Sequence, residues 1–186
     1  DLNNDGKLDI ATANQSNNTV SVRFGDGLGN FGDYASAKYF AVGSNPFYVI
    51  ASDLNNDGKQ DLVAVNYVNN NISVLINNGD GTLKPTINYS VGARPRSVFA
   101  ADFNHDGKMD LVTANQISNN ISVLLGKGDG TFGLATNYSA GNNPMSVFAS
   151  DLNNDGNLDL ITANSSSNPS LFLGNGDGTF TSSNIT

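Results

Sequence analysis

The residues DFNHDGKMD at positions 102–110, followed by the strand-like run LVTAN, carry the pattern from which the architecture of this chain can be predicted. Three further copies of the nine-residue loop begin at Asp1 (DLNNDGKLD), Asp53 (DLNNDGKQD) and Asp151 (DLNNDGNLD). The four loops start 52, 49 and 49 residues apart. A period near 50 residues predicts one supersecondary unit that is repeated along the chain.

Each loop places oxygen-bearing residues at alternating positions, which is how a short peptide surrounds calcium. Positions one, three, five and nine would supply carboxylate or amide oxygens, and position seven its backbone carbonyl. The glycine at position six permits the sharp turn. The sequence therefore predicts about four Ca²⁺ ions, one per loop. The predicted ligands are Asp1, Asn3, Asp5, Lys7 and Asp9; Asp53, Asn55, Asp57, Lys59 and Asp61; Asp102, Asn104, Asp106, Lys108 and Asp110; and Asp151, Asn153, Asp155, Asn157 and Asp159.

Two other interpretations of the loops are an EF-hand and a set of metal-free turns. An EF-hand needs a glutamate at position twelve and flanking helices, whereas here position twelve is Thr12, Ala64, Thr113 or Thr162 and the following residues are apolar and strand-like. Metal-free Asx turns would also explain the asparagines and aspartates. Three converging carboxylates would then repel one another, so metal binding is favoured. The number of oxygen ligands and the lack of a phosphate-binding motif favour calcium over magnesium.

Four strand-like runs joined by hairpin connections make up each repeat, and no stretch shows a helical period. In the third copy these runs cover residues 95–101, 109–115, 120–126 and 136–141. Proline opens the first run at Pro46, Pro95 and Pro144. Four antiparallel strands per repeat predict an all-β fold built from β-propeller blades.

Two smaller motifs have mainly structural interpretations. Gly-Asp-Gly occurs at 25–27, 79–81, 128–130 and 176–178, and it predicts tight hairpin turns rather than phosphate loops. Only a minor role in binding is assigned to the turn aspartates, which are Asp26, Asp80, Asp129 and Asp177. Aromatic residues recur in the fourth strand, where we expect them to pack between blades, at Phe40, Tyr89 and Tyr138.

The pattern SVFAADFNHDGKMDLVTAN followed by ISVLLGKGDGTF resembles the FG-GAP/VCBS repeat family, to which integrin α-like calcium-binding propeller repeats belong. The resemblance covers nearly the whole chain. It implies calcium at positions one, three, five, seven and nine of each loop, and usually a ring of seven blades. Asparagine at position three departs from the family pattern, removes one charge per site and predicts a lower affinity.

The repeat predicts a single propeller segment over residues 1–186, with blades at about 1–44, 45–93, 94–142 and 143–186. The first blade lacks a proline-led innermost strand and is expected to be incomplete. Together the blades would contain about fifteen strands. We expect a part of a larger, seven-bladed propeller or blade array, with a closed four-bladed ring as the alternative. Open ends expose strand edges and apolar faces, so self-association is expected there.

The composition of the chain limits the classes of partner that it is expected to bind. All 17 acidic residues are aspartates, twelve lie in the loops, and the net charge is −8, which four divalent ions would neutralise. The chain has no basic patch, which argues against nucleic acid, and no apolar run of membrane-spanning length. Calcium sites of modest affinity fill only where calcium is abundant, so an extracellular location, secreted or at the cell surface, is expected.

These features favour a non-catalytic extracellular module that mediates adhesion, assembly or the binding of a protein or glycan. A carbohydrate-binding lectin is the alternative. A propeller-type polysaccharide lyase or hydrolase is the third candidate, disfavoured because the chain has no glutamate and commits most aspartates to metal. The single histidine, His105, lies at position four of the third loop, where an exposed structural role is expected.

Overall fold

A computed structural model describes residues 1–183 of the chain. In that part the structure has fifteen strands and one short 3-10 helix. Their bounds are β1 Ile10–Asn14, β2 Thr19–Arg23, η1 Tyr34–Ser36, β3 Lys38–Ala41, β4 Pro46–Ser52, β5 Asp61–Asn66, β6 Asn71–Leu75, β7 Ile87–Ser90, β8 Pro95–Ala101, β9 Asp110–Asn115, β10 Asn120–Leu124, β11 Thr136–Ser139, β12 Pro144–Ser150, β13 Asp159–Asn164, β14 Ser170–Gly174 and β15 Phe180–Ser183.

The strands form four antiparallel sheets in which each strand pairs with its neighbours in sequence. The sheets have the orders β1-β2-β3, β4-β5-β6-β7, β8-β9-β10-β11 and β12-β13-β14-β15. We refer to them as blades one to four. Blade one has three strands because it lacks the proline-led strand that opens the others. The all-β fold of repeated blades is therefore confirmed.

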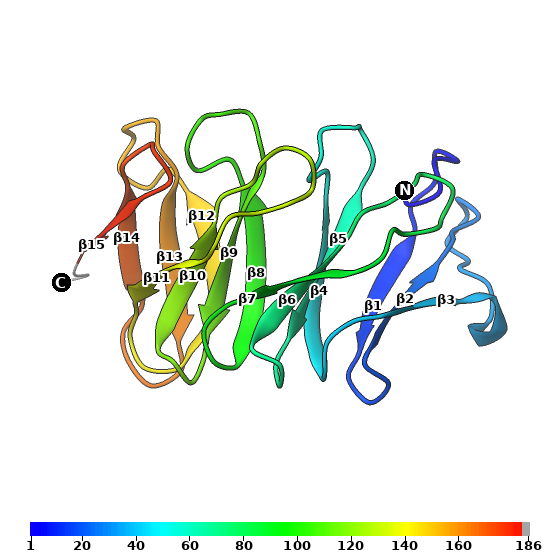
Figure 1. Cartoon of the computed structure of the whole chain (residues 1–186), viewed down its shortest axis with the longest axis horizontal. Helices are drawn as coiled ribbons and strands as arrows, with labels where there is room; N and C mark the ends of the chain where they lie inside the picture. Colours follow the sequence, from blue (N-terminus) through cyan, green and yellow to red (C-terminus); the bar gives the residue numbers. More distant parts are fainter. Residues whose placement is uncertain (184–186) are drawn as a thin grey trace.

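The blades stand side by side in a row, and blades one and four lie at opposite ends of it (Figure 1). The alternative of a closed four-bladed ring is therefore wrong for the described residues, while a ring of seven blades stays a prediction. No helix in residues 1–183 has the length and apolar character that a membrane span requires.

The second strand of an inner blade is covered on both faces. All six residues of β5 are buried, as are all six of β9. Their side chains alternate between the two faces of the sheet, so one set contacts the preceding blade and the other the following blade. The registers Ile50↔Val63 and Val63↔Val74 align apolar side chains across three strands of blade two. This burial explains why these strands are nearly continuous apolar runs.

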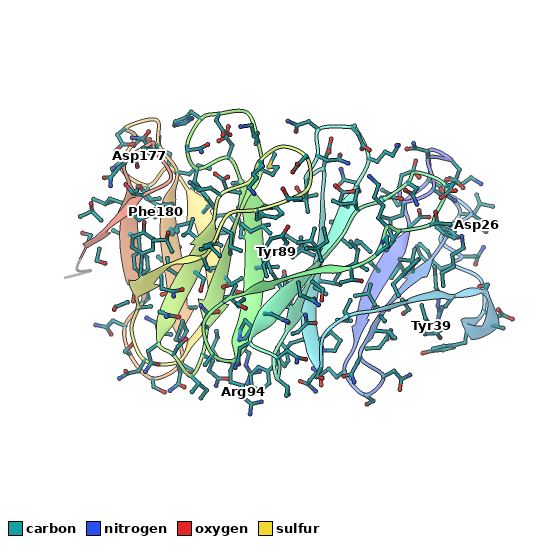
Figure 2. The ribbon with its side chains drawn as sticks, in the orientation of Figure 1. Asp26, Tyr39, Tyr89, Arg94, Asp177 and Phe180 are labelled. Atoms are coloured by element: carbon teal, nitrogen blue, oxygen red, sulfur yellow. The ribbon has the colours of Figure 1, made fainter. Side chains whose placement is uncertain are left out.

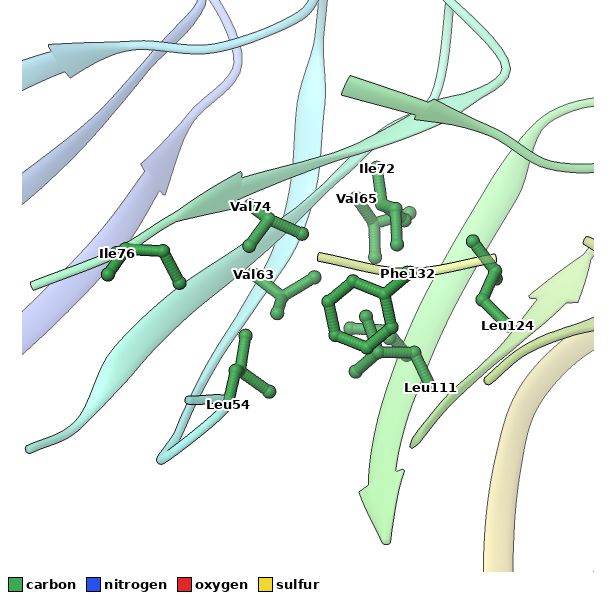
Figure 3. Packing of buried hydrophobic residues seen from close by; sticks show 10 residues of the cluster. Leu54, Val63, Val65, Ile72, Val74, Ile76, Leu111, Leu124 and Phe132 are labelled. Carbon is green, nitrogen blue, oxygen red and sulfur yellow. The ribbon is translucent and has the colours of Figure 1, made fainter. Parts of the chain in front are cut away.

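Three apolar clusters fill the spaces between consecutive blades. Figure 3 shows the middle cluster, where side chains of β5 and β6 meet Leu111, Leu124 and Phe132 of blade three. Each fully buried Val, Leu or Ile contributes roughly 1.5–3 kcal/mol. The blades are thus held together mainly by side chains that no single blade could bury alone.

The aromatic residues of the fourth strand pack between blades, as predicted. Tyr89 meets the Phe132 ring edge-on at 5.5 Å between centroids, and Tyr138 meets Phe180 at 5.8 Å. Phe40 packs against the cluster between blades one and two. The backbone N–H of Phe132 also donates to the Tyr89 hydroxyl at 3.3 Å. These aromatics therefore join each blade to the next.

One turn prediction is wrong in register. The Gly25 N–H donates to Asp9, just as the Gly126 N–H donates to Asp110, so Gly25 corresponds to Gly126. The counterpart of the turn at 128–130 is therefore 27–29, and not the Gly-Asp-Gly at 25–27. At 79–81, 128–130 and 176–178 both glycines, and not the aspartate, adopt positive φ angles. The three extra residues of the first repeat lie between this turn and β3, where η1 forms.

Candidate metal centres

All four loops lie on one rim of the blades, which we call the loop rim. Each loop connects the first and second strands of its blade, or precedes β1 in blade one (Figure 1). The turns at 27–29, 79–81, 128–130 and 176–178, which we call the Gly-X-Gly turns, lie on the same rim (Figures 1 and 2). The aspartate at position nine begins the second strand of blades two, three and four, as predicted. Local sequence thus places twelve carboxylates at one edge of the molecule.

Hydrogen bonds within each loop hold the side chains at positions one, three and five. In the second loop Asp53 Oδ1 accepts from the Asp57 N–H at 3.2 Å and Oδ2 from the Gly58 N–H at 2.8 Å. Asn55 Oδ1 accepts from Asp57 at 3.1 Å. Position four takes a positive φ, 58° at Asn56, which asparagine tolerates well. The same bonds recur in the other three loops.

His105 occupies position four of the third loop with φ 58°. It is exposed, as expected, and its Nε2 lies 3.2 Å from Asn157 Oδ1 of the next loop. In the second loop Asn56 donates to the Gly107 carbonyl at 3.0 Å. Position four thus links adjacent loops along the rim, a role that spacing within one loop did not indicate.

The aspartate at position nine closes the loop. Asp61 is fully buried; its Oδ2 accepts from the Leu54 N–H at 3.0 Å and its Oδ1 from the Asn77 N–H at 2.7 Å. One carboxylate therefore fastens the start of the loop to the end of the third strand. Equivalent pairs of bonds occur at Asp9, Asp110 and Asp159. The loop motif predicts a metal ligand at this position, but it does not indicate the hydrogen bonds that this carboxylate makes to the start of the loop and to the end of the third strand.

The carboxylates of one loop change the pKa of the buried aspartate at position nine. Burial raises the pKa of Asp61, the amide hydrogen bonds from Asn77 and Leu54 oppose that rise, and the negative charges of Asp57 and Asp53 add to it. The pKa of Asp110 is raised in the same way by burial and by the aspartates of its own loop. A divalent cation among these groups would relieve the repulsion.

Lysine at position seven has a side-chain role that sequence analysis missed. Lys59 Nζ lies 3.3 Å from Asp57 Oδ2, and Lys108 Nζ lies 3.1 Å from Asp106 Oδ2. The hydrogen bond from Lys108 lowers the pKa of Asp106. Because Asn157 stands at this position in the fourth loop, Asp155 has no such lysine there. A cation that bound position five through Oδ2 would compete with the lysine.

The donor set fits a hard cation. Every side chain at positions one, three, five and nine offers an oxygen atom as a metal ligand, and a carboxylate oxygen has more than one lone pair. The structure brings positions one, three and five together and ties position nine to the amide of position two. Within residues 1–183 no three acidic or histidine side chains converge as a metal cluster. The four calcium sites therefore stay a prediction.

Comparison with known proteins identifies the family. The profile of the FG-GAP-like repeat matches residues 1–64, 53–113, 103–162 and 151–186. The chain belongs to the FG-GAP-like repeat family, as the resemblance of the loops indicated. No curated protein sequence matches the chain.

Several solved structures are similar to this chain, at identities that establish the fold alone. An Agrocybe aegerita lectin, described as recognising non-reducing terminal N-acetylglucosamine, gives a TM-score of 0.57 at 21% identity, covering 88% of this chain and 45% of the lectin. The Vibrio cholerae biofilm matrix protein Bap1 gives 0.55 at 19% identity, covering 97% and 28%. A protein of unknown function from Desulfotomaculum acetoxidans gives 0.62 at 18%, covering 94% and 54%. The chain thus spans about half or less of these structures.

Proposed function

We propose that this chain is a non-catalytic binding module that works outside the cell and is stabilised by one calcium ion in each loop. The observation that carries the proposal is a loop that repeats four times with aspartate at positions one, five and nine and asparagine at position three, and whose side-chain oxygens accept the same backbone hydrogen bonds each time. A loop that served only as a turn would not need this repeated negative charge. The residues that would hold the ion are those at positions one, three, five, seven and nine.

The expected contribution of calcium is comparable with the stability of an ordinary domain. At about 1 mM calcium, a site with a dissociation constant near 10⁻⁴ M gains about 1.4 kcal/mol by mass action. Four such sites would contribute about 5–6 kcal/mol, whereas whole domains are stable by about 5–15 kcal/mol. Cytosolic calcium is too scarce to fill sites of this affinity, which supports an extracellular location.

The surroundings of the aspartates support a role other than catalysis. Each of the 17 accepts a hydrogen bond from a backbone N–H of its own loop, turn or 3-10 helix. Examples are Asp53 in a loop, Asp80 in a turn and Asp33 at the 3-10 helix. Acid–base hydrolysis needs a pair of carboxylates aimed at a substrate, one with a raised pKa. The two raised pKa values belong to Asp61 and Asp110, whose oxygens are both engaged by backbone amides.

The related folds support a partner that is a glycan or a protein. One similar structure is a lectin and another is a biofilm matrix protein. Both present propeller blades, which offer rims and faces for binding while the blade cores supply stability. The proposal therefore places adhesion or partner binding on the outer surfaces of the blades.

Thermal melting in about 1 mM calcium and in excess EGTA tests the calcium part of the proposal. Removing calcium is expected to lower the midpoint by about 10–20 °C, because each kcal/mol corresponds to about 2–4 °C in a domain of this size. Asp106→Asn should reduce the shift. Asp129→Asn makes the same charge change in a Gly-X-Gly turn and should preserve it. An EGTA-insensitive midpoint would refute calcium stabilisation.

A further inference from the structure

The two rims of the blades differ in charge. All but one of the 17 aspartates lie on the loop rim, in the loops and the Gly-X-Gly turns or just before such a turn; Asp33 caps η1. The opposite rim, which we call the turn rim, contains the hairpins 15–18, 67–70, 116–119 and 165–169 and the connections 42–45, 91–94 and 140–143. These segments have no Asp, Glu or Lys. Figure 2 shows Arg94 on this rim, away from Asp26 and Asp177.

A cluster of two arginines and two aromatic rings spans blades two and three at the turn rim. The Arg96 guanidinium carbon lies 4.4 Å from the ring centroid of Phe47 and 4.8 Å from that of Tyr67. The corresponding distance from Arg94 to Tyr67 is 4.7 Å. The two rings are 6.0 Å apart. Stacking of this kind orients a guanidinium and keeps its edge available for a ligand. We call these four residues the arginine–aromatic cluster.

Gln116 fixes the cluster further. Its Oε1 accepts a hydrogen bond from Arg96 Nε at 2.9 Å and another from the Tyr67 hydroxyl at 3.2 Å. Within residues 1–183 the terminal guanidinium nitrogens of Arg94 and Arg96 make no hydrogen bond, and neither arginine forms a salt bridge. Two oriented cations with free N–H donors therefore stand on a rim without carboxylates.

The cluster is built once and is not required by the repeat. Phe47 and Arg96 occupy the place of Met145, and Tyr67 and Gln116 occupy the place of Ser165. Arg94 has φ 57°, at the position where Asn45 and Asn143 have 56° and 54°. Asparagine tolerates this left-handed conformation better than arginine does. The backbone of the repeat therefore favours asparagine here and does not require the arginine.

We propose that the arginine–aromatic cluster binds the carboxylate groups of a uronic-acid-containing polysaccharide. A guanidinium presents paired N–H donors that match a carboxylate. The exposed side chains flanking the cluster on the same rim include the amides and hydroxyl of Asn69, Ser118 and Asn119, which suit sugar hydroxyls. They also include the apolar Val68 and Ile117, which suit the C–H face of a sugar ring. An acidic peptide offers carboxylates but few hydroxyls. The inference rests on the proposed binding role and adds the ligand class and its place.

Binding by the whole chain in calcium tests this inference. A hyaluronan oligosaccharide supplies glucuronate, chitohexaose serves as the neutral sugar and hexa-aspartate as the acidic peptide. Calorimetry should show binding to hyaluronan alone, weakened by added salt. The double variant Arg94→Asn, Arg96→Gln should bind about tenfold or more weakly, since a hydrogen bond to a charged group contributes about 1.5–3 kcal/mol.

Arg23→Gln is the matched control, because Arg23 also stacks on an aromatic ring, 4.4 Å from Tyr34, but lies outside the turn rim. It should leave hyaluronan binding unchanged. Equal binding by the double variant, binding of chitohexaose or hexa-aspartate in preference to hyaluronan, or no binding to any probe overturns the inference. The shift in melting temperature with calcium is measured on the same samples. A preserved shift without sugar binding refutes this inference alone, whereas a lost shift refutes the calcium role.

Discussion

Replacing Ala64 with threonine is expected to stabilise the protein by supplying a hydrogen bond that blade two lacks. Among the described residues, Asn66 Oδ1 is buried without a hydrogen-bond partner. In blade three the equivalent oxygen, Asn115 Oδ1, accepts from Thr113 Oγ1 at 3.0 Å, and blade four repeats this bond. Ala64 stands where Thr113 stands, two residues before the asparagine.

The magnitude follows from the cost of the unsatisfied oxygen. A buried acceptor without a partner costs about 1–3 kcal/mol. The added atoms must fit between blades one and two, where blade one presents Ala11 and Val20 at the positions of Val63 and Ile72 in blade two. Because these side chains are smaller than their counterparts, the packing cost of the added atoms should be small. The expected gain is about 1–2 kcal/mol, or about 2–8 °C in the melting midpoint.

Urea denaturation at constant calcium measures the free energy of unfolding. Ala64→Val is the matched control, because valine has the shape of threonine without its hydroxyl. Threonine should be more stable than valine by about 1 kcal/mol, which is the typical contribution of one hydrogen bond. If the threonine variant were equal to or less stable than the valine variant, the interpretation of Asn66 as an unsatisfied acceptor would be wrong.

Three further predictions concern the loops, the turns and the outer face of blade four. Lys108→Ala removes the ammonium group that lies 3.1 Å from Asp106. Calcium binding at that loop should tighten by up to about fivefold, since an exposed ion pair contributes at most about 1 kcal/mol. An unchanged calcium affinity in calorimetry would contradict the competition between lysine and calcium. The hydrogen bonds from Thr131 lower the pKa of Asp129, so they stabilise the fold above pH 4 and this contribution disappears as pH falls through the lowered value. Thr131→Val should therefore reduce the loss of stability on acidification, and an identical pH profile would count against it. Leu152 is 48% exposed, whereas its counterparts in the other loops are buried beneath a neighbouring blade. An exposed apolar side chain at this position favours contact with another copy of the chain. Leu152→Ser should therefore weaken self-association in sedimentation experiments without lowering the melting midpoint.

The parts of the fold that depend on local chemistry were predictable from the sequence. Alternating apolar residues, the prolines at Pro46, Pro95 and Pro144, and the aspartate-rich loops fixed the strands and their order within each blade. The aromatic packing of Tyr89 and Tyr138 was also predictable, because a repeat exposes one face that only the next repeat covers. In a repeat protein, the sequence of one repeat thus predicts which of its side chains contact the next blade.

Contacts between residues distant in sequence, and features found in one repeat alone, were not predictable in this way. Asp61 holds the amide of Asn77, sixteen residues away, and nothing in the loop motif indicates that bond. The turn at 27–29 was hidden by a Gly-Asp-Gly two residues earlier, and only pairing with Asp9 identifies the register. The stacking of Arg96 on Phe47 joins residues 49 positions apart that have different chemistry in equivalent places.

The separation of the two rims explains how one repeat can combine a constant structural role with a variable binding role. On the loop rim, positions one, five and nine are aspartate in every repeat, and their hydrogen bonds recur from blade to blade. On the turn rim, equivalent positions carry phenylalanine, arginine or methionine at the start of the first strand. Stability comes from the blade cores and the loops, so substitutions on the turn rim cost little. Ligand binding there should therefore be only weakly coupled to calcium: saturating hyaluronan should leave calcium affinity within about twofold, a coupling below about 0.4 kcal/mol. A larger reciprocal change in either affinity would show that the two rims do not act independently.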